Sequence, residues 1–264
     1  MADLDAALLV RREPPLAWVI VNRPAARNAL NAAVWDGLAG AAEELAIDAA
    51  VRVVILRGAG EQAFISGADI SEFRALRADA TATAAYDARS ARAWRALQAM
   101  PQPVMAMIHG FCFGGGVAVA LACDLRFAAD DARFAVPAAR LGLSYPFESL
   151  DRLVRVVGPT HAADILLSAR TLSAVEAQHI GFVNRLVPAA DLERVTRAYA
   201  LAMSEGAPLT LAAHKRAIQE GLKSAETRDL DAVRELARRC FDSADYQEGI
   251  AAFLEKRPAR FQGR

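Results

Sequence analysis

The chain has 264 residues, of which 54% are hydrophobic and 23% are charged, an ordinary globular composition. Lys plus Arg and Asp plus Glu balance at 31 each, which argues against a nucleic acid or an acidic membrane as the partner. The four histidines stand far apart, so no metal site is expected, and three cysteines without CxxC spacing favour reduced thiols in the cytoplasm.

The first half of the chain alternates apolar runs typical of buried strands with stretches of helical periodicity. In chain order the predicted elements are a strand at 16–24, a helix at 31–48 with Asn31 as N-cap, a strand at 51–58, a helix at 81–100, a strand at 104–109, a helix at 114–122 and a strand at 124–129. This alternation predicts α/β layering with a mostly parallel sheet. The uncharged stretch 104–123 is long enough for a membrane span, but His109, Gly110 and a glycine triplet interrupt it, and acids before the first apolar residues argue against a signal peptide.

After about Pro146 the strand signals almost stop. Ser173 and Glu176 predict a capping box, Gly181 a helix end, and residues 182–187 a short strand. From Leu192 helical patterns follow one another to the end of the chain. We expect these amphipathic helices to pack on another surface, such as a neighbouring subunit.

Glycine-rich segments suggest two kinds of site. Gly58-Ala-Gly60-Glu-Gln-Ala63 matches a dinucleotide-binding fingerprint, but that fingerprint needs a helix directly afterwards, and the sequence has AFISGAD instead. The segments FISGADI and FGGG could each expose a backbone N–H group from a turn of small residues. Two such groups converging on one oxygen would form an oxyanion hole, whereas simple close packing is the alternative for either segment alone.

Several motifs together resemble the crotonase (enoyl-CoA hydratase/isomerase) superfamily over nearly the whole chain. They are Asn22-Arg-Pro with Asn28-Ala-Leu30, Ala63-Phe-Ile-Ser-Gly-Ala-Asp-Ile70, His109-Gly with Gly114-Gly-Gly116, Cys123-Asp124, Ala177-Gln-His-Ile-Gly181, Glu248-Gly, and Glu255-Lys-Arg257. The resemblance implies an α/β fold built as a spiral of β-β-α units. It also implies an acyl-CoA substrate with no cofactor beyond its CoA moiety.

The same resemblance divides the chain and assigns its assembly. Residues 1–200 would form the acyl-CoA-binding core and residues 201–264 a helical region that builds homotrimers or dimers of trimers. The resemblance places the thioester oxygen between the N–H groups of Ala68 and Gly115.

Coenzyme A contacts are implied at four further positions. Arg27, Ala29 and Ile70 would cradle the CoA nucleotide, and Lys256 would reach a phosphate bound by a neighbouring subunit. Arg and Lys on surface loops are also often merely solvated, so those two contacts have a plain alternative.

The chain departs from the family pattern where hydratases have two glutamates that activate water and supply a proton. Alanines, Ala118 and Ala138, stand there, which makes ordinary hydratase activity doubtful. Glu148 could be a relocated acid or base, or only a first-turn acid that favours a helix dipole. Tyr145 could hydrogen-bond a reacting group or line the acyl pocket.

The leading hypothesis is an acyl-CoA enzyme of hydratase/isomerase type that stabilises a thioester enolate. One alternative is a non-catalytic acyl-CoA-binding protein. Another is a decarboxylase of malonyl-type thioesters, because loss of CO2 generates the enolate without a base. A nicotinamide oxidoreductase is the most distant possibility.

Overall fold

In a computed structural model, which describes residues 6–72 and 79–264, the expected strands assemble into one sheet. Within the described chain this sheet is six-stranded, in the order β1-β2-β3-β5-β7-β10. The strands are β1 (Leu8–Glu13), β2 (Leu16–Val21), β3 (Val53–Gly58), β5 (Val104–Ile108), β7 (Leu125–Ala129) and β10 (Arg185–Val187). Among the described strands of this sheet only β1 and β2 pair antiparallel, so the prediction of a mostly parallel sheet is confirmed. The sequence reading missed β1, and residues 1–5 of the N-terminal segment lie outside the described part.

A second, smaller sheet was not predicted. Its short strands are β4 (Ala63–Ile65), β6 (Phe111–Phe113), β8 (Arg133–Ala135) and β9 (Leu172–Ser173), in that order across the sheet. The strands β3, β5 and β7 of the large sheet are each followed by a strand of the small sheet and then by a helix. The chain therefore winds as repeated β-β-α units, as expected.

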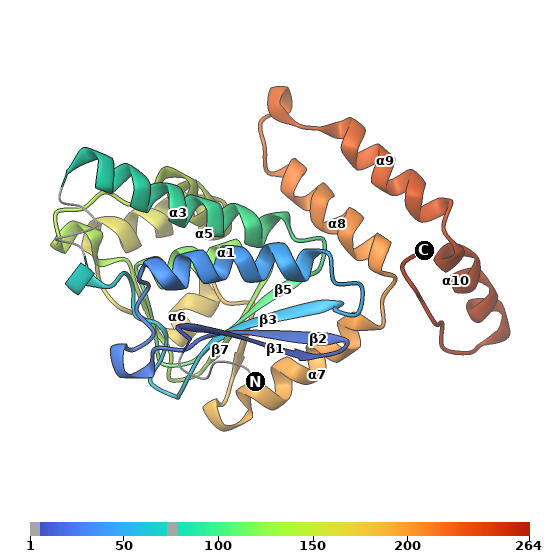
Figure 1. Cartoon of the computed structure of the whole chain (residues 1–264), viewed down its shortest axis with the longest axis horizontal. Helices are drawn as coiled ribbons and strands as arrows, with labels where there is room; N and C mark the ends of the chain where they lie inside the picture. The colour runs from blue at the N-terminus through green and yellow to red at the C-terminus, as the bar shows by residue number, and fades with distance from the viewer. Residues whose placement is uncertain (1–5, 73–78) are drawn as a thin grey trace.

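The helices cover both faces of the large sheet (Figure 1). They are α1 (Ala32–Ala46), α3 (Ala80–Ala99), α4 (Gly115–Ala122), α5 (Phe147–Ser168), α6 (Ala174–His179), α7 (Leu192–Ser204), α8 (Pro208–Gly221), α9 (Leu230–Phe241) and α10 (Ala244–Glu255), with 3-10 turns at Pro24–Ala26, Pro137–Arg140, Ala189–Asp191 and Ala225–Thr227. The predicted N-cap is confirmed, because the Asn31 side chain accepts a hydrogen bond from Val34 N. In the described part of the chain, no helix is long and apolar enough to cross a membrane.

Alternating residues of the large sheet pack into two separate cores. Ala17, Val19 and Leu56 face the core shared with α1, α3, α4, α5 and the small sheet. Trp18 and Ile55 face the opposite side, where Leu192 and Ala200 of α7 cover them. Helix α4, which carries the glycine triplet, is buried within the first core.

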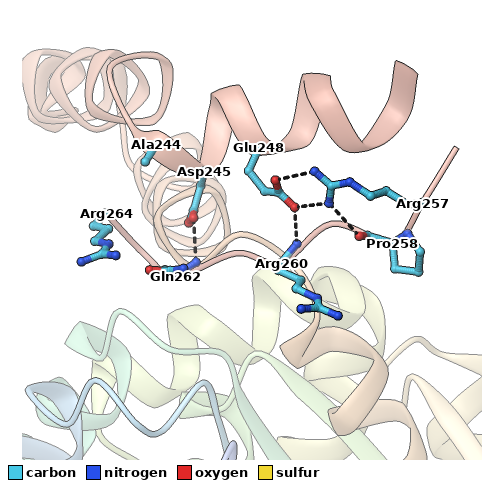
Figure 2. Close-up of a pocket in the computed structure, with 8 residues that line it drawn as sticks. All are labelled: Ala244, Asp245, Glu248, Arg257, Pro258, Arg260, Gln262 and Arg264. Carbon is cyan, nitrogen blue, oxygen red and sulfur yellow. Dashed lines mark hydrogen bonds and ion pairs between the residues drawn. The ribbon is translucent and has the colours of Figure 1, made fainter. Parts of the chain in front are cut away.

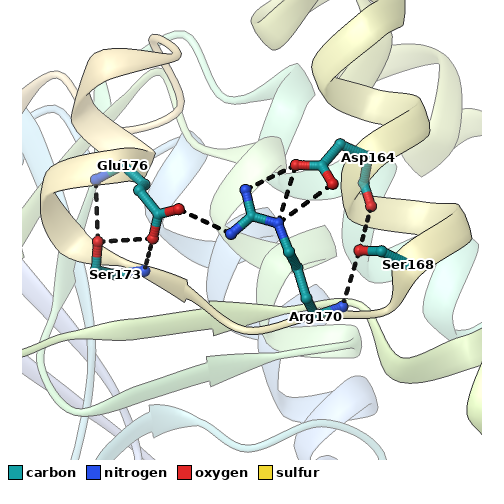
Figure 3. Close-up of polar contacts among 5 residues, drawn as sticks. All are labelled: Asp164, Ser168, Arg170, Ser173 and Glu176. Carbon is teal, nitrogen blue, oxygen red and sulfur yellow. Dashed lines mark hydrogen bonds and ion pairs between the residues drawn. The ribbon is translucent and has the colours of Figure 1, made fainter.

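The junction between α5 and α6 confirms the predicted capping box. Ser173 Oγ accepts from Glu176 N at 3.2 Å, and the Glu176 carboxylate accepts from Ser173 N at 2.8 Å (Figure 3). Arg170 lies between Asp164 and Glu176 and pairs with both, at 2.7 and 2.8 Å. These hydrogen bonds, first that from Ser173 N and then that from Arg170, hold the pKa of Glu176 at about 2.

The C-terminal helices leave the layered core one after another. Helix α8 is tied to the core by Lys215, whose Nζ lies 2.8 Å from Asp124 and 3.0 Å from Gln102 O. Helix α9 packs on α8, and α9 and α10 project away from the sheets (Figure 1). The predicted division at residue 200 falls inside α7, which packs on the sheet, while the projecting helices begin only after α8.

Candidate functional site

The loop after β2 and the loop after β4 are joined by a short parallel bridge between Leu30 and Ala68. Leu30 N donates to Gly67 O at 2.8 Å, and Asp69 N donates to Leu30 O at 2.9 Å. In a parallel bridge the neighbours of the paired residue make the bonds, so the N–H of Ala68 itself points away from Leu30. The turn FISGAD thus presents one backbone donor in a fixed direction.

Asn28 holds this region together from the inside. Its side chain is fully buried, and its Nδ2 donates to Ala59 O at 2.9 Å and Ala63 O at 2.7 Å. Its Oδ1 accepts from Arg23 N at 3.0 Å. Asn28 has φ of +58°, a conformation in which asparagine is several-fold enriched. The sequence reading included Asn28 in a motif but missed this anchoring role, for which an Asn inside a turn of small residues is the only local signal.

Asp69 lies directly after Ala68, but its carboxylate is occupied. It accepts from Ser71 Oγ at 2.6 Å and pairs with Arg23 Nη2 at 2.8 Å. These hydrogen bonds, that of Ser71 first, lower the pKa of Asp69. Asp69 therefore braces the loop as an anion and is not a free base.

The glycine triplet supplies the second turn. Gly114 has φ of +47°, and its N–H donates to Ala135 O at 2.8 Å, which ties the start of α4 to β8. A Cβ on Gly115 would lie 2.7 Å from Leu30 Cδ1 and 3.7 Å from Ala68 N. The two predicted turns, 47 residues apart in sequence by the numbers 68 and 115, therefore meet in space as expected.

Two backbone donors remain free where these turns meet. Among residues 6–72 and 79–264, neither Ala68 N nor Gly115 N donates to any acceptor. Gly115 is the first residue of α4, so its N–H also lies at the positive end of the helix dipole. Such a pair of donors can bind an oxygen atom that carries, or develops, negative charge.

Tyr145 reaches the same turn from the loop before α5. Its hydroxyl donates to Gly114 O at 2.9 Å, and its ring packs against the first core. Burial raises the pKa of the Tyr145 hydroxyl, and the nearby Cys112 thiol adds to the shift. At neutral pH the hydroxyl is therefore protonated and remains a donor.

Glu148 is in the first turn of α5, as the sequence indicated. Its side chain is exposed and makes no hydrogen bond or ion pair with the described residues. The structure thus brings Tyr145 into contact with the glycine turn. Glu148 lies in the first turn of α5, and no hydrogen bond or ion pair among the described residues joins it to that turn.

Apolar residues occupy the two positions where the family resemblance implies catalytic glutamates. Ala118 is buried on α4, and Ala138 is half-buried in the 3-10 turn Pro137–Arg140. His109, which directly follows β5, is buried, and its Nε2 has no hydrogen-bond partner among the described residues; burial lowers its pKa to about 4. Residues 6–72 and 79–264 contain no cluster of three or more His, Cys, Asp or Glu that could hold a metal ion.

Of the four residues expected to contact CoA, three are exposed and Ala29 is buried. Arg27 has φ of +49°, is exposed, and extends over the Phe111 ring at 5.7 Å. Ala29 is buried beside it, and Ile70 is 55% exposed. Lys256 is exposed at the end of α10, away from the other three.

A cavity of about 560 Å³ lies between α10 and the C-terminal segment (Figure 2). Two of its charged side chains pair with each other, Glu248 with Arg257 at 2.7 Å, and the Asp245 carboxylate accepts from Gln262 N and Gly263 N. No residue of the two glycine turns lines it. These contacts fasten the last residues to α10.

The dinucleotide fingerprint at 58–63 does not have the structure it requires. Strand β4, not a helix, follows the glycines. A Cβ on Gly58 would lie 2.4 Å from Asn28 Nδ2 and 2.3 Å from Ala63 O, so this glycine permits close packing around Asn28. The interpretation as a plain loop agrees with the structure.

Comparison with known proteins gives one consistent family. The family model described as enoyl-CoA hydratase/isomerase matches residues 12–264. The probable enoyl-CoA hydratase echA8 of Mycobacterium bovis is 36% identical over 257 residues, 97% of this chain and 98% of that protein. The crotonyl-CoA hydratase of Syntrophomonas wolfei is 35% identical over 255 residues, 96% of this chain and 97% of that protein. The crystal structure of an enoyl-CoA hydratase/carnithine racemase from Magnetospirillum magneticum matches with a TM-score of 0.93 at 40% identity, covering 98% of this chain and 96% of that one.

Proposed function

The chain belongs to the enoyl-CoA hydratase/isomerase family, and from that premise we propose that it binds an acyl-CoA thioester oxygen between Ala68 N–H and Gly115 N–H. The family resemblance predicted from the motifs is confirmed, and so is the α/β fold with a helical C-terminal region.

One observation carries this proposal: two free backbone donors from separate turns lie side by side at the start of α4. Hydrogen bonds from both would draw electron density onto the thioester oxygen and stabilise an enolate formed at the neighbouring carbon. The donors are main-chain groups held by buried neighbours, so they need no reorganisation as charge develops.

The site has fewer evident groups for proton transfer than for binding the thioester oxygen. The relatives are named enoyl-CoA hydratases, yet Ala118 and Ala138 provide no group that could activate water. We propose Glu148 as the acid or base, since it is exposed, unpaired among the described residues and three positions from Tyr145. In this arrangement Tyr145 contacts the scaffold of the hole and does not itself transfer a proton.

The binding mode for the rest of the substrate follows the predicted positions. Arg27 and Ile70 flank the Ala68 turn and would hold the CoA nucleotide against Ala29. Lys256 would add a contact from another subunit. The exposed apolar residues Phe253 and Leu254 at the end of α10, 83% and 74% exposed, support burial of this helix in a homotrimer or a dimer of trimers.

The assembly can be tested by sedimentation velocity. The wild type should sediment as a trimer or hexamer, and Phe253→Asp should shift it toward the monomer. A wild type that stays monomeric at micromolar concentration would contradict the proposed subunit contact of Lys256. The predicted cytoplasmic location stays a prediction.

The oxyanion hole is tested by the infrared spectrum of a bound saturated thioester. Butyryl-CoA, isotope-labelled at its carbonyl carbon, should absorb at lower wavenumber when bound to the wild type than when free in buffer. An unshifted carbonyl band, with binding shown by calorimetry, contradicts the hole.

Glu148 is tested by turnover of crotonyl-CoA and a longer trans-2-enoyl-CoA in the wild type and Glu148→Gln. Glu44→Gln, which changes an exposed carboxylate on α1, is the matched control. Hydration lost only in Glu148→Gln, with acyl-CoA binding intact, supports the acid/base role. Binding without hydration in the wild type favours the acyl-CoA-binding protein, unless CO2 is released from malonyl-CoA, which favours the decarboxylase.

A further inference from the structure

The N–H of Gly115 and the carbonyl of Gly114 belong to the same peptide group. Because a peptide group is planar and trans, its C=O and N–H point in opposite directions, and whatever holds the oxygen also aims the hydrogen. The oxygen of this peptide is held by the Tyr145 hydroxyl at 2.9 Å. Tyr145 thus acts on the amide group whose N–H is proposed to bind the substrate.

The second donor is supported in a parallel way. Ala68 N–H belongs to the peptide whose carbonyl is Gly67 O, and Leu30 N donates to that oxygen at 2.8 Å. One donor of the pair is therefore aimed by a backbone hydrogen bond and the other, in part, by a side chain. A single substitution can remove the Tyr145 hydroxyl and leave the backbone contacts in place. No side-chain substitution removes the Leu30 N–H group in this way.

The Gly114–Gly115 peptide is oriented by hydrogen bonds and not by side chains of its own residues. Gly114 has φ of +47° and both residues lack a side chain, so little in the local sequence restricts the peptide plane. The helical N–H groups of Val117 and Ala118 also point at Gly114 O, at 2.9 and 3.2 Å. Among the residues that the structure describes, Tyr145 is the one donor to Gly114 O from outside α4.

A hydrogen bond to an amide oxygen also changes the amide electronically. It polarises the group, and chains of hydrogen bonds of this kind strengthen one another by roughly 10–30% per bond. The Tyr145 hydroxyl stays protonated at neutral pH, so this donation persists wherever the enzyme would work. Its effect is to make Gly115 N–H a better donor.

We infer that Tyr145 is a positioning residue of the oxyanion hole: its hydroxyl aims and polarises the Gly114–Gly115 peptide, whose N–H binds the thioester oxygen. This inference rests on the proposed function. It assigns to Tyr145 neither contact with the reacting carbon nor transfer of a proton.

The test compares wild type with Tyr145→Phe, which keeps the ring and removes the hydroxyl. The readout is the carbonyl band of bound, isotope-labelled butyryl-CoA. We expect the downward shift of this band to shrink by roughly 10–30%. For any thioester that the wild type turns over, kcat should fall about 10-fold with KM little changed, less than the ~100-fold or more expected for outright loss of a hole donor.

Tyr199→Phe is the control, because it removes a hydroxyl from α7. The Tyr199 ring packs on Phe127 on the face of the large sheet opposite α4. Its carbonyl band should match that of the wild type. If Tyr145→Phe does not fold, site-specific replacement of Tyr145 by a ring-fluorinated tyrosine tests the same point. That residue is a stronger donor and should move the band further down.

The outcomes separate this inference from the proposed function. A shifted band in the wild type that is unchanged in Tyr145→Phe, even with a lowered melting temperature, leaves Tyr145 as a loop anchor only and overturns the inference. An unshifted band in the wild type overturns the hole itself and the inference with it.

Discussion

Gly116 is the position in the glycine triplet where a side chain has least room. A Cβ placed there would lie 2.3 Å from Ile65 O and 3.0 Å from Ile65 Cβ. An ordinary carbon–oxygen contact needs about 3.3 Å, so Gly116→Ala requires a separation of about 1 Å between α4 and β4. Ile65 is fully buried in a short strand at the edge of the small sheet, and the obstructing oxygen belongs to its backbone, so it cannot turn aside as an exposed side chain would.

The expected cost follows from what has to move. Overpacking a core typically costs about 1–3 kcal/mol, and here the obstacle is a backbone oxygen, so we expect the free energy of unfolding to fall by about 3 kcal/mol. The same displacement carries Gly115 N–H away from Ala68 N–H. A misplacement of about 1 Å can lower turnover about 100-fold.

Urea unfolding followed by circular dichroism measures the stability, and Gly40→Ala provides the matched control. A Cβ on Gly40, in the middle of α1, meets nothing within 4 Å. This control should gain about 0.5–1 kcal/mol because alanine loses less conformational entropy in a helix. A Gly116→Ala protein within about 0.5 kcal/mol of wild type, with an unchanged urea dependence, would refute the packing argument.

Three further predictions concern buried charged or polar groups. Lys215→Met should lower the free energy of unfolding by about 2–3 kcal/mol because it leaves Asp124 without its ion-pair partner. In urea unfolding, adding Asp124→Asn should recover part of this loss, and no recovery would contradict the pairing. Arg126→Met should cost about 3 kcal/mol, since the buried guanidinium donates to the carbonyls that end α4, and a neutral result in the same assay would contradict this. His109 has its pKa lowered to about 4, so between pH 6.5 and pH 4 the unfolded chain binds the extra proton. The free energy of unfolding should therefore fall by up to about 3 kcal/mol as the pH is lowered from 6.5 to 4. Unfolding of His109→Gln at several pH values should lack this contribution to the pH dependence.

Five of the six described strands of the large sheet were predictable from the sequence, whereas β1 and the small sheet were not. Long apolar runs such as Val104–Ile108 carry a clear strand signal because every residue of a strand between two layers is buried. Strands β4, β6 and β8 have three residues each, too short for any periodic pattern. They become strands because β3, β5 and β7, which precede them, are neighbours in the large sheet and so place them next to one another.

The site divides in the same way. The glycines and the Ala68 turn could be recognised because their small residues form local motifs, and the structure brings them together. The contact of Tyr145 with Gly114 spans 31 positions of sequence and depends on how the loop before α5 folds back. Asn28 likewise makes its bonds to residues 31 and 35 positions away. No local pattern contains such partners.

The proposed oxyanion hole consists of backbone groups and does not depend on side chains that carry protons. This separation can be tested by placing carboxylates at the two positions where the family resemblance implies them. Ala118→Glu and Ala138→Glu together should give crotonyl-CoA hydration above the wild-type rate, whereas either change alone should give little, because water activation and proton supply are shared between the two groups. Placing charge at the buried Ala118 should cost several kcal/mol of stability, roughly the penalty for a poorly paired buried charge. Hydration is followed by loss of the enoyl thioester absorbance, with Glu44→Gln as the unaffected control. A folded double variant that binds acyl-CoA but hydrates no faster than wild type would mean that the bound thioester does not face Ala118 and Ala138, and that the acyl chain leaves the hole in another direction.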